Sequence, residues 1–368
     1  MRIAFVYLGQ QGAGAALDTL EMAVGLASKA DVMCIVSSKA NNYKAWLIEA
    51  EKNPRIKIYG VKTTKNVVIG MLNFLNIWKF KKIRNDINKF NPDIVFSHMG
   101  HPWERIIIPY LNCKIAAKGI HDVNLHAGEN TLKARLMARF FHFETPYKVV
   151  FSDFSRRELE KQGIAPNCIL TTQLGCNSLM VNNKQPDYEW HGKFLFFGRL
   201  IKYKGIDVLM RSLDDILIKH PDEKLVIAGR GDLSEYEEIT NRFRANLEIH
   251  NEFIPDNEVE RYFRDVDFVV APYTNATQSG VVLLSYSFAR PVIASNSGGL
   301  PEQVEDGYSG YIVQANDSVE LANTINKMIS SPEELIKMKK AAYELSHKLT
   351  WQRSALLLYN QFVNILKN

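Results

Sequence analysis

The sequence lacks most of the features that mark a secreted or membrane-spanning protein. It has only four cysteines among 368 residues, none in a Cys-x-x-Cys pair, which argues against a structural zinc site and a disulfide framework. No run approaches the ~20 apolar residues that span a bilayer. Residues 67–80, the nearest candidate, contain Asn73, Asn76 and Lys79. The N-terminal run MRIAFVYLG has no separate charged segment or cleavage site, so we expect no signal peptide. These absences predict a cytoplasmic protein with reduced thiols.

A strong excess of one charge sign is missing from the whole chain but not from its halves. Apolar residues make up 46% and charged residues 23%, which excludes a disordered or fibrous protein, and the length suits two domains. The net charge of +5 combines +11 in residues 1–185 with −6 in the remainder. We therefore expect the two halves to meet different partners.

Short apolar runs alternate with helical patterns in both halves, which predicts parallel sheets covered by helices on both faces. The expected strands and helices are residues 3–8, 19–29, 32–36, 94–97 and 148–152, then 194–197, 206–219, 224–228, 247–253, 258–264, 268–271, 281–289 and 292–294. We predict an N-terminal domain at 1–180, a polar linker at 181–192, a C-terminal domain at 193–345 and a final helix at 346–368 that packs back on the first domain. The predicted fold class is α/β, with two facing doubly wound, Rossmann-like domains and a cleft between them.

Glycines follow the first expected strand, in the stretch GQQGAG at residues 9–14. Gly12 and Gly14 would let a ligand approach the backbone and the start of the next helix. The spacing is not G-x-G-x-x-G, and no acidic residue follows at the interval that suits a ribose, so a dinucleotide fingerprint is disfavoured. A cleft-lining loop and a tight turn remain the two interpretations.

Two cations follow the first strand of the second half, in the stretch FGRLIKYKGID. Gly198 ends the strand, and Arg199 and Lys204 precede a helix. A diphosphate leaving group needs cations and a helix N-terminus to stabilise its charge, whereas simple surface cations are the alternative. Two further strand ends, at Gly229 and Ile254, are expected to border the cleft, the second where a backbone could contact a nucleobase.

A polar loop in the stretch APYTNATQSGVVLL leads from a strand into a helix. Gln278 precedes the helix. The amides of Ser279, Gly280 and Val281 are expected to be exposed and to form an anion-binding helix start.

The motifs of the second half occur in the order GRLIKYKGID, VIAGRGD, FIPDNEVERYF, APYTNATQSGVVLLSYSFARPVIASNSGGLPE and DGYSGYIV. With these motifs the chain resembles the GT-B-fold glycosyltransferases of family 4, the retaining group 1 type, over nearly its whole length. Two segments of the first half, GIHD and FSDFSRREL, are similar to the family's histidine loop and its S-x-F-S segment. The resemblance implies transfer of a sugar from a nucleotide-sugar donor with retention. It also implies that the donor binds mainly to the C-terminal domain and the acceptor mainly to the N-terminal domain.

The resemblance further implies residue roles. Arg199 and Lys204 match the diphosphate-binding pair, and His121 matches the histidine that approaches the donor sugar, so these three are the catalytic candidates. The family's paired glutamates fall at Thr277 and Ser285, so the chain is a variant without them, in which a Gln-Ser-Gly loop would contact sugar and phosphate. Without a protein nucleophile, retention implies a same-face attack in which the β-phosphate oxygen takes the acceptor proton.

The segment Asp265-Val266-Asp267 looks like the D-x-D metal motif of another glycosyltransferase class. It falls between an expected helix and strand, and Asp267 matches the aspartate that begins this strand in the family. We therefore expect no metal and no other cofactor.

The basic half contains a cationic segment at residues 78–89, where Trp78 and five Lys/Arg residues follow the apolar run MLNFL. This mixture suits an interfacial helix on an anionic membrane, and family relatives commonly glycosylate lipid-linked acceptors at such a surface. A solvated helix face is the alternative. No recognisable nucleic-acid-binding motif is present, so no nucleic-acid partner is expected.

These observations predict a glycosyltransferase of polysaccharide or glycoconjugate assembly that acts on a glycan or lipid-linked acceptor. We expect it in the cytoplasm, at most peripheral on the inner face of the membrane. Two rivals stay open: a sugar-nucleotide epimerase of the same fold, and a non-catalytic glycan- or membrane-binding relative, motivated by Thr277 and Ser285.

Overall fold

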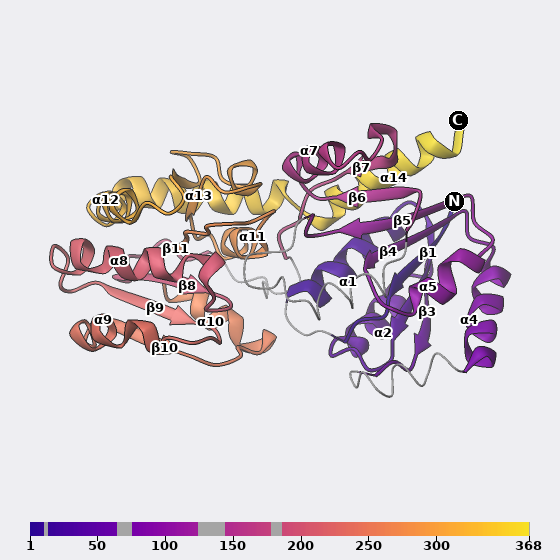
Figure 1. The fold of residues 1–368 in the computed structure, drawn as a ribbon, viewed down its shortest axis with the longest axis horizontal. Helices are drawn as coiled ribbons and strands as arrows, with labels where there is room; N and C mark the ends of the chain where they lie inside the picture. The colour runs from indigo at the N-terminus through magenta and orange to yellow at the C-terminus, as the bar shows by residue number, and fades with distance from the viewer. Residues whose placement is uncertain (11–13, 65–75, 124–143, 178–185, 368) are drawn as a thin grey trace. The chain divides into compact units, whose positions relative to one another are not determined.

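The computed structural model describes residues 1–10, 14–64, 76–123, 144–177 and 186–367, which form two α/β units (Figure 1). Unit 1 contains the described residues of 1–123, 131–175 and 351–368, and unit 2 those of 176–350. Each unit has one sheet whose recorded strand pairs are all parallel. The predicted fold class of two doubly wound parallel sheets is confirmed.

Unit 1 has a seven-stranded sheet in the order β3-β2-β1-β4-β5-β6-β7. Its strands are β1 (Arg2–Tyr7), β2 (Asp31–Ser37), β3 (Ile56–Val61), β4 (Ile94–Met99), β5 (Ile115–Ile120), β6 (Tyr147–Val150) and β7 (Ile169–Thr171). The α-helices among its described residues are α1 (Gly14–Ala27), α2 (Tyr43–Lys52), α4 (Ile77–Phe90), α5 (Glu104–Ile107), α7 (Asp153–Lys161) and α14 (Trp351–Lys367). β1 is buried along five of its six residues because it is central and has neighbours on both edges.

Unit 2 has a six-stranded sheet in the order β10-β9-β8-β11-β12-β13. Its strands are β8 (Lys193–Phe197), β9 (Lys224–Ala228), β10 (Leu247–His250), β11 (Phe268–Ala271), β12 (Val292–Ser295) and β13 (Gly310–Val313). Its helices are α8 (Ile206–Leu217), α9 (Glu237–Arg242), α10 (Val259–Arg264), α11 (Gly280–Ser287), α12 (Ser318–Ile329) and α13 (Pro332–Lys348). The strand order reverses at β8, which pairs with β9 on one edge and β11 on the other, and ligands of such sheets bind at the carboxyl ends next to this point.

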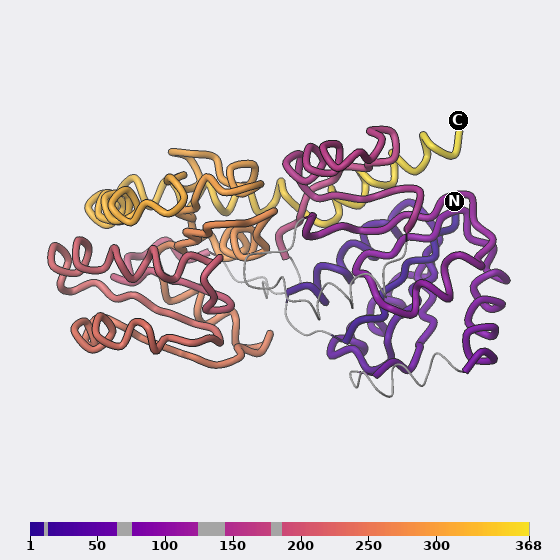
Figure 2. Tube along the Cα trace, viewed as in Figure 1, coloured from indigo at the N-terminus to yellow at the C-terminus, as the bar shows by residue number. Residues whose placement is uncertain are grey.

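Helix α14 belongs to unit 1 although it ends the chain, and Figure 2 traces its return to the unit that holds the N-terminus. It packs on α1, where a Cβ on Gly25 would come within 2.6 Å of the Ala355 Cβ, so glycine permits the close approach. The Gln361 side chain accepts a hydrogen bond from the Thr171 amide at 3.1 Å and donates to the Thr171 carbonyl at 2.8 Å. The backbone of edge strand β7 is thereby paired by the last helix.

Candidate active site

The carboxyl ends of β8 and β9 meet at two glycines, Gly198 and Gly229. Gly229 has a φ of +146°, and a Cβ there would lie 1.8 Å from the Gly198 carbonyl oxygen. Gly198 has a φ of +117° with no atom within 4 Å of its Cβ position. Both positions therefore need glycine for the backbone conformation, and the space beside Gly198 is open.

Two tyrosines hold the cations of the following loop. The Arg199 guanidinium donates from Nη2 to the Tyr203 hydroxyl at 2.8 Å, and the Lys204 ammonium lies 3.8 Å from the ring centroid of Tyr273. Tyr203 and Tyr273 are both buried, whereas Arg199 is exposed and Lys204 is half-buried. The rings fix the two side chains while the charged ends stay near solvent.

The same loop is fastened to the segment after β11. A Cβ on Gly205 would lie 1.8 Å from the Pro272 carbonyl oxygen, and Gly205 has a φ of +74° at the N-cap of α8. The Thr274 amide donates to the Tyr203 carbonyl at 2.9 Å. Because these contacts join the two loops, the cations and the start of α11 belong to one local assembly.

The start of α11 differs from the sequence-based expectation in one respect. The Ser279 amide is not exposed, because it donates to Gln303 Oε1 at 2.7 Å. Gly280 is exposed with no atom within 4 Å of its Cβ position, and Val281 is half-buried. The first three helical residues, Gly280, Val281 and Val282, have amides without intrahelical acceptors, but Val282 is fully buried, so Gly280 and Val281 are the two that remain for an anion.

Thr277 and Ser285, where the resemblance would place paired glutamates, are both buried. Ser285 donates from Oγ to the Val281 carbonyl at 2.8 Å, within its own helix, and Thr277 is 3% exposed. Gln278, at the end of the loop, is half-buried, and the Ile254 side chain is buried.

In unit 1, His121 follows the end of β5. Its Nε2 lies 3.1 Å from the His98 carbonyl oxygen, which can only accept, so Nε2 carries the proton. The ring stacks on Phe151 at a centroid distance of 4.5 Å. Burial lowers the pKa of His121, opposed by the His98 carbonyl and the Asp122 carboxylate. Gly119 makes this geometry possible, since a Cβ there would lie 2.4 Å from the His98 carbonyl oxygen.

The ring of His98 contacts that of His121, at a centroid distance of 4.9 Å, and belongs to an aromatic cluster that the sequence analysis did not predict. Its ring is fully buried, and Nδ1 lies 3.0 Å from the Thr19 hydroxyl oxygen. Burial holds the pKa of His98 well below its ordinary value, and the neighbouring His121 adds to this shift. Four further rings surround it: Phe5, Phe96, Phe151 and Trp351.

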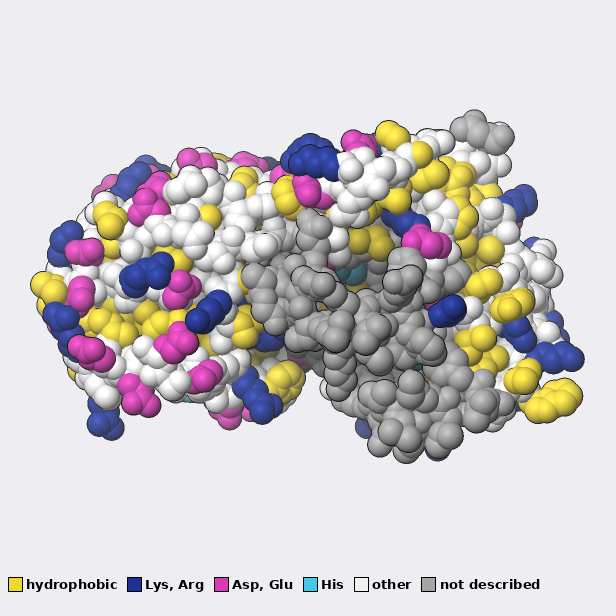
Figure 3. Space-filling model, viewed as in Figure 1, with side chains coloured by type: hydrophobic (Ala, Val, Ile, Leu, Met, Phe, Trp, Pro, Cys, Tyr) yellow, Lys and Arg dark blue, Asp and Glu magenta, His cyan; other side chains and the backbone are white. Residues whose placement is uncertain are grey.

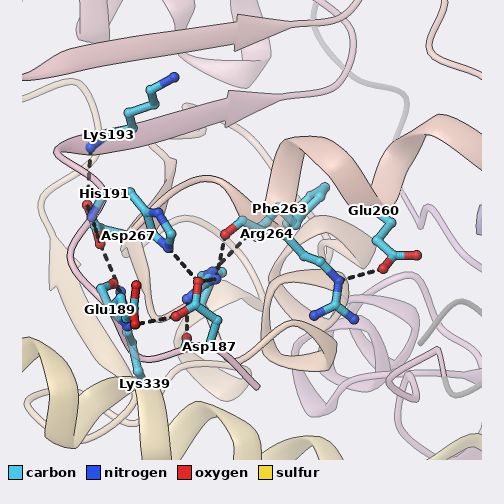
Figure 4. A network of polar contacts seen from close by, with 10 residues as sticks. Asp187, Glu189, His191, Lys193, Glu260, Phe263, Arg264, Asp267 and Lys339 are labelled. Atoms are coloured by element: carbon cyan, nitrogen blue, oxygen red, sulfur yellow. Dashed lines mark hydrogen bonds and ion pairs between the residues drawn. The ribbon is translucent and has the colours of Figure 1, made fainter. Parts of the chain in front are cut away.

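The Asp-Val-Asp segment has a structural role at Asp267 (Figure 4). The Asp267 carboxylate accepts from the amides of His191 and Lys193 and from the Lys339 ammonium, the last at 2.8 Å. The Arg290 guanidinium, fully buried, donates to the carbonyl of Asp187 at 2.7 Å. Residues 187–193 are thus anchored within unit 2.

Within the described ranges, no group of three or more His, Cys, Asp or Glu side chains could hold a metal ion. Nor is any helix there long and apolar enough to cross a bilayer. Gly12 lies outside the described residues, and Gly14 is the first residue of α1.

The structure also gives roles to three residues to which the sequence analysis gave none: Tyr203 and Tyr273, which lie within the quoted motifs, and Gln303, which follows one. Their contacts join segments up to 71 positions apart in the chain, as in the Thr274–Tyr203 pair, so a linear pattern carries no signal for them.

Known protein families and solved structures that are similar to this chain agree with its architecture. Residues 191–331 match the family described as "Glycosyl transferases group 1". An uncharacterized glycosyltransferase of Methanocaldococcus jannaschii is 25% identical over 310 residues, which cover 79% of this chain and 83% of the relative. The D-inositol 3-phosphate glycosyltransferase of Corynebacterium jeikeium is 28% identical over 178 residues, and the match spans 45% of this chain and 42% of that relative.

Among solved structures, Anabaena HepE in complex with UDP and glucose superimposes with a TM-score of 0.72 at 16% identity, covering 100% of this chain and 99% of HepE. At that identity the likeness concerns the fold.

Proposed function

Because the chain has the GT-B fold and residues 191–331 match the group 1 glycosyl transferases, we propose that the protein is a retaining glycosyltransferase. It moves a sugar from a nucleotide-sugar donor to a glycan or lipid-linked acceptor in polysaccharide or glycoconjugate biosynthesis. The observation that carries the donor site is the assembly of Arg199, Lys204 and the start of α11 at the carboxyl edge of the unit 2 sheet. HepE was solved with UDP and glucose, which makes a uridine diphosphate sugar the first donor to test.

The proposed chemistry needs no protein nucleophile. The bond between the sugar C1 and the β-phosphate oxygen breaks, the acceptor oxygen bonds to C1 on the same face, and the acceptor proton moves to a β-phosphate oxygen. Arg199, Lys204 and the Gly280 and Val281 amides stabilise the charge that develops on the diphosphate. Ser285 and Thr277 supply no carboxylate near the sugar, which supports this route over a double displacement. The resemblance also gives His121, which is uncharged near neutral pH because burial lowers its pKa, a role toward the donor sugar. We propose that the reaction requires no metal.

We further propose that the enzyme acts in the cytoplasm, at the inner face of an anionic membrane, through helix α4. Ile77 and Trp78 at its start are 67% and 80% exposed, far more than tryptophan usually is. The Lys81 ammonium lies 5.6 Å from the Trp78 ring centroid, and the opposite side of the helix buries Phe80 into the core. Hydrophobic and Lys/Arg side chains lie together over this helix at the right edge of Figure 3. An exposed tryptophan among lysines is typical of helices that rest on anionic lipid.

A panel of UDP-, GDP- and dTDP-sugars tests the donor site. The wild type should gain thermal stability with one nucleoside diphosphate and slowly hydrolyse the matching sugar nucleotide. Arg199→Ala should abolish both effects and keep the unliganded melting temperature, because Arg199 is exposed. If the sugar of the nucleotide-sugar donor is epimerised in a reaction without acceptor, the protein is an epimerase. If the donor binds but is never turned over, the protein is a non-catalytic relative. A wild type that binds no member of the panel would refute the donor site.

A further inference from the structure

Gln303 pairs with the backbone of Ser279 at both of its polar atoms. The Gln303 Oε1 accepts from the Ser279 amide at 2.7 Å, and Gln303 Nε2 donates to the Ser279 carbonyl at 3.1 Å. Ser279 is the N-cap residue of α11, but its own side chain makes no cap hydrogen bond. Its hydroxyl donates to the Tyr273 hydroxyl at 3.2 Å instead. A side chain from 24 positions along the chain therefore satisfies the amide that an N-cap would normally leave to solvent or ligand.

Gln303 is itself held at its backbone. Its amide donates to the Leu300 carbonyl at 2.9 Å, and its carbonyl accepts from the Tyr286 hydroxyl at 3.0 Å. Tyr286 lies in α11, is fully buried and also lies 2.8 Å from the Ser309 hydroxyl oxygen. The segment after β12 is thus bonded to the N-cap of α11 and, through Tyr286, to a residue near the C-terminal end of the same helix, which fixes the position of the helix.

We propose that Gln303 is a positioning residue for the donor diphosphate, a role that rests on the proposed function. By engaging Ser279, it limits the anion-binding amides to Gly280 and Val281 and holds them beside the loop of Arg199 and Lys204. The neutral amide is essential to this role. A carboxylate would still accept from the Ser279 amide, but it could not donate to the Ser279 carbonyl and would place a negative charge beside the phosphates.

The test compares Gln303→Glu and Gln303→Ala with the wild type and with Gln314→Glu. Gln314 is a matched control because it is exposed, lies in the same unit and accepts from Asn296 rather than from α11. Binding of UDP, UMP and uridine is measured by calorimetry, with GDP and dTDP in parallel. Melting temperature and the hydrogen exchange of a peptide covering 278–284 are recorded for each variant.

Gln303→Glu should keep the melting temperature of the wild type, since a negative charge suits a helix N-terminus. It should weaken the binding of UDP on the order of tenfold, because the new charge repels the phosphates, and should hardly change the binding of uridine. Gln303→Ala should speed exchange across 278–284, and Gln314→Glu should change neither property. If the wild type binds UDP and Gln303→Glu binds it equally well, the positioning role is wrong while the proposed function stands. If the wild type binds no nucleoside diphosphate, the proposed function itself fails, and the positioning role fails with it.

Discussion

The Lys204 ammonium lies 3.8 Å from the centre of the Tyr273 ring, and the Tyr273 hydroxyl in turn accepts from the Ser279 hydroxyl at 3.2 Å. One buried aromatic side chain therefore contacts both a proposed phosphate-binding cation and the N-cap residue of the proposed phosphate-binding helix. The ring restricts the long, flexible lysine side chain and leaves its charge available for a phosphate. A carboxylate partner would instead neutralise that charge.

Replacing Tyr273 tests the aromatic contact directly. Tyr273→Phe keeps the ring and should change donor binding little, whereas Tyr273→Leu should weaken it by about 10–30-fold, in line with a cation–π contact of about 2 kcal/mol when desolvated. Donor KM and kcat are measured separately, because a lysine that is no longer held in place should raise KM, whereas a smaller fraction of folded enzyme should lower kcat alone. Tyr311→Leu is the matched control, because Tyr311 also has a lysine, Lys327, at 4.3 Å from its ring but lies on β13. Equal losses in Tyr273→Leu and Tyr311→Leu would contradict a specific role for the Tyr273 ring.

The sequence pattern predicted five of the six strands of unit 2 and missed β13, and there is a physical reason for its success. β11 is short, continuously apolar and buried, and β9 is so from its second residue on; both have the predicted bounds, 224–228 and 268–271. The predicted strand at 247–253 is too long, since β10 ends at His250 and Phe253 is 60% exposed. Apolar side chains alone do not show where pairing stops.

The site could be predicted only where it follows the local chain. Gly198 and Gly229 are recognisable because backbone conformation is encoded by the residue itself. The Ser279 amide is the opposite case, since nothing near it in sequence indicates that Gln303 occupies it. Tertiary hydrogen bonds between distant segments decide which groups stay available, and those bonds carry no local pattern.

The face of α4 provides a test of membrane binding. Lys81→Ala with Lys82→Ala should weaken sedimentation with phosphatidylglycerol vesicles by ~30-fold, at about 1 kcal/mol for each lysine. Trp78→Ala should weaken it further, because an interfacial tryptophan contributes through its ring. Trp190→Ala is the control, since Trp190 is 42% exposed but belongs to unit 2. Binding that is equal on phosphatidylcholine and phosphatidylglycerol, or equal in all variants, would favour a solvated helix face.

The ion pair between Asp267 and Lys339 should matter for stability rather than for catalysis. Both side chains are almost fully buried, at 0% and 1% exposure. Lys339→Met leaves the buried Asp267 carboxylate with two backbone donors but without the ammonium that lies 2.8 Å away, and should cost about 3–5 kcal/mol. Lys340→Met, at the exposed next position, should have little effect. Urea unfolding followed by circular dichroism measures the difference, and similar midpoints for the two variants would contradict the assignment.

Glu104 should make stability depend on pH near neutrality. Its carboxyl is buried at the start of α5, and burial raises its pKa to about 8, opposed by the Ser97 hydroxyl and the Lys118 ammonium. Between its ordinary pKa and about 8, the folded protein holds a proton that the unfolded chain has released. Its contribution to stability is therefore present at low pH and falls by up to about 1.4 kcal/mol per pH unit across that window.

Glu104→Gln removes the titrating group, so its melting temperature should rise relative to the wild type as the pH is raised from 5 to 8. Glu235→Gln, which removes one exposed carboxylate, controls for the change in net charge. Differential scanning fluorimetry over this range measures the two slopes. Parallel curves for the wild type and Glu104→Gln would mean that the Glu104 carboxyl ionises equally in the folded and unfolded chain. In that case water or ion pairing with Lys118 would have to offset the burial of this carboxyl at the start of α5.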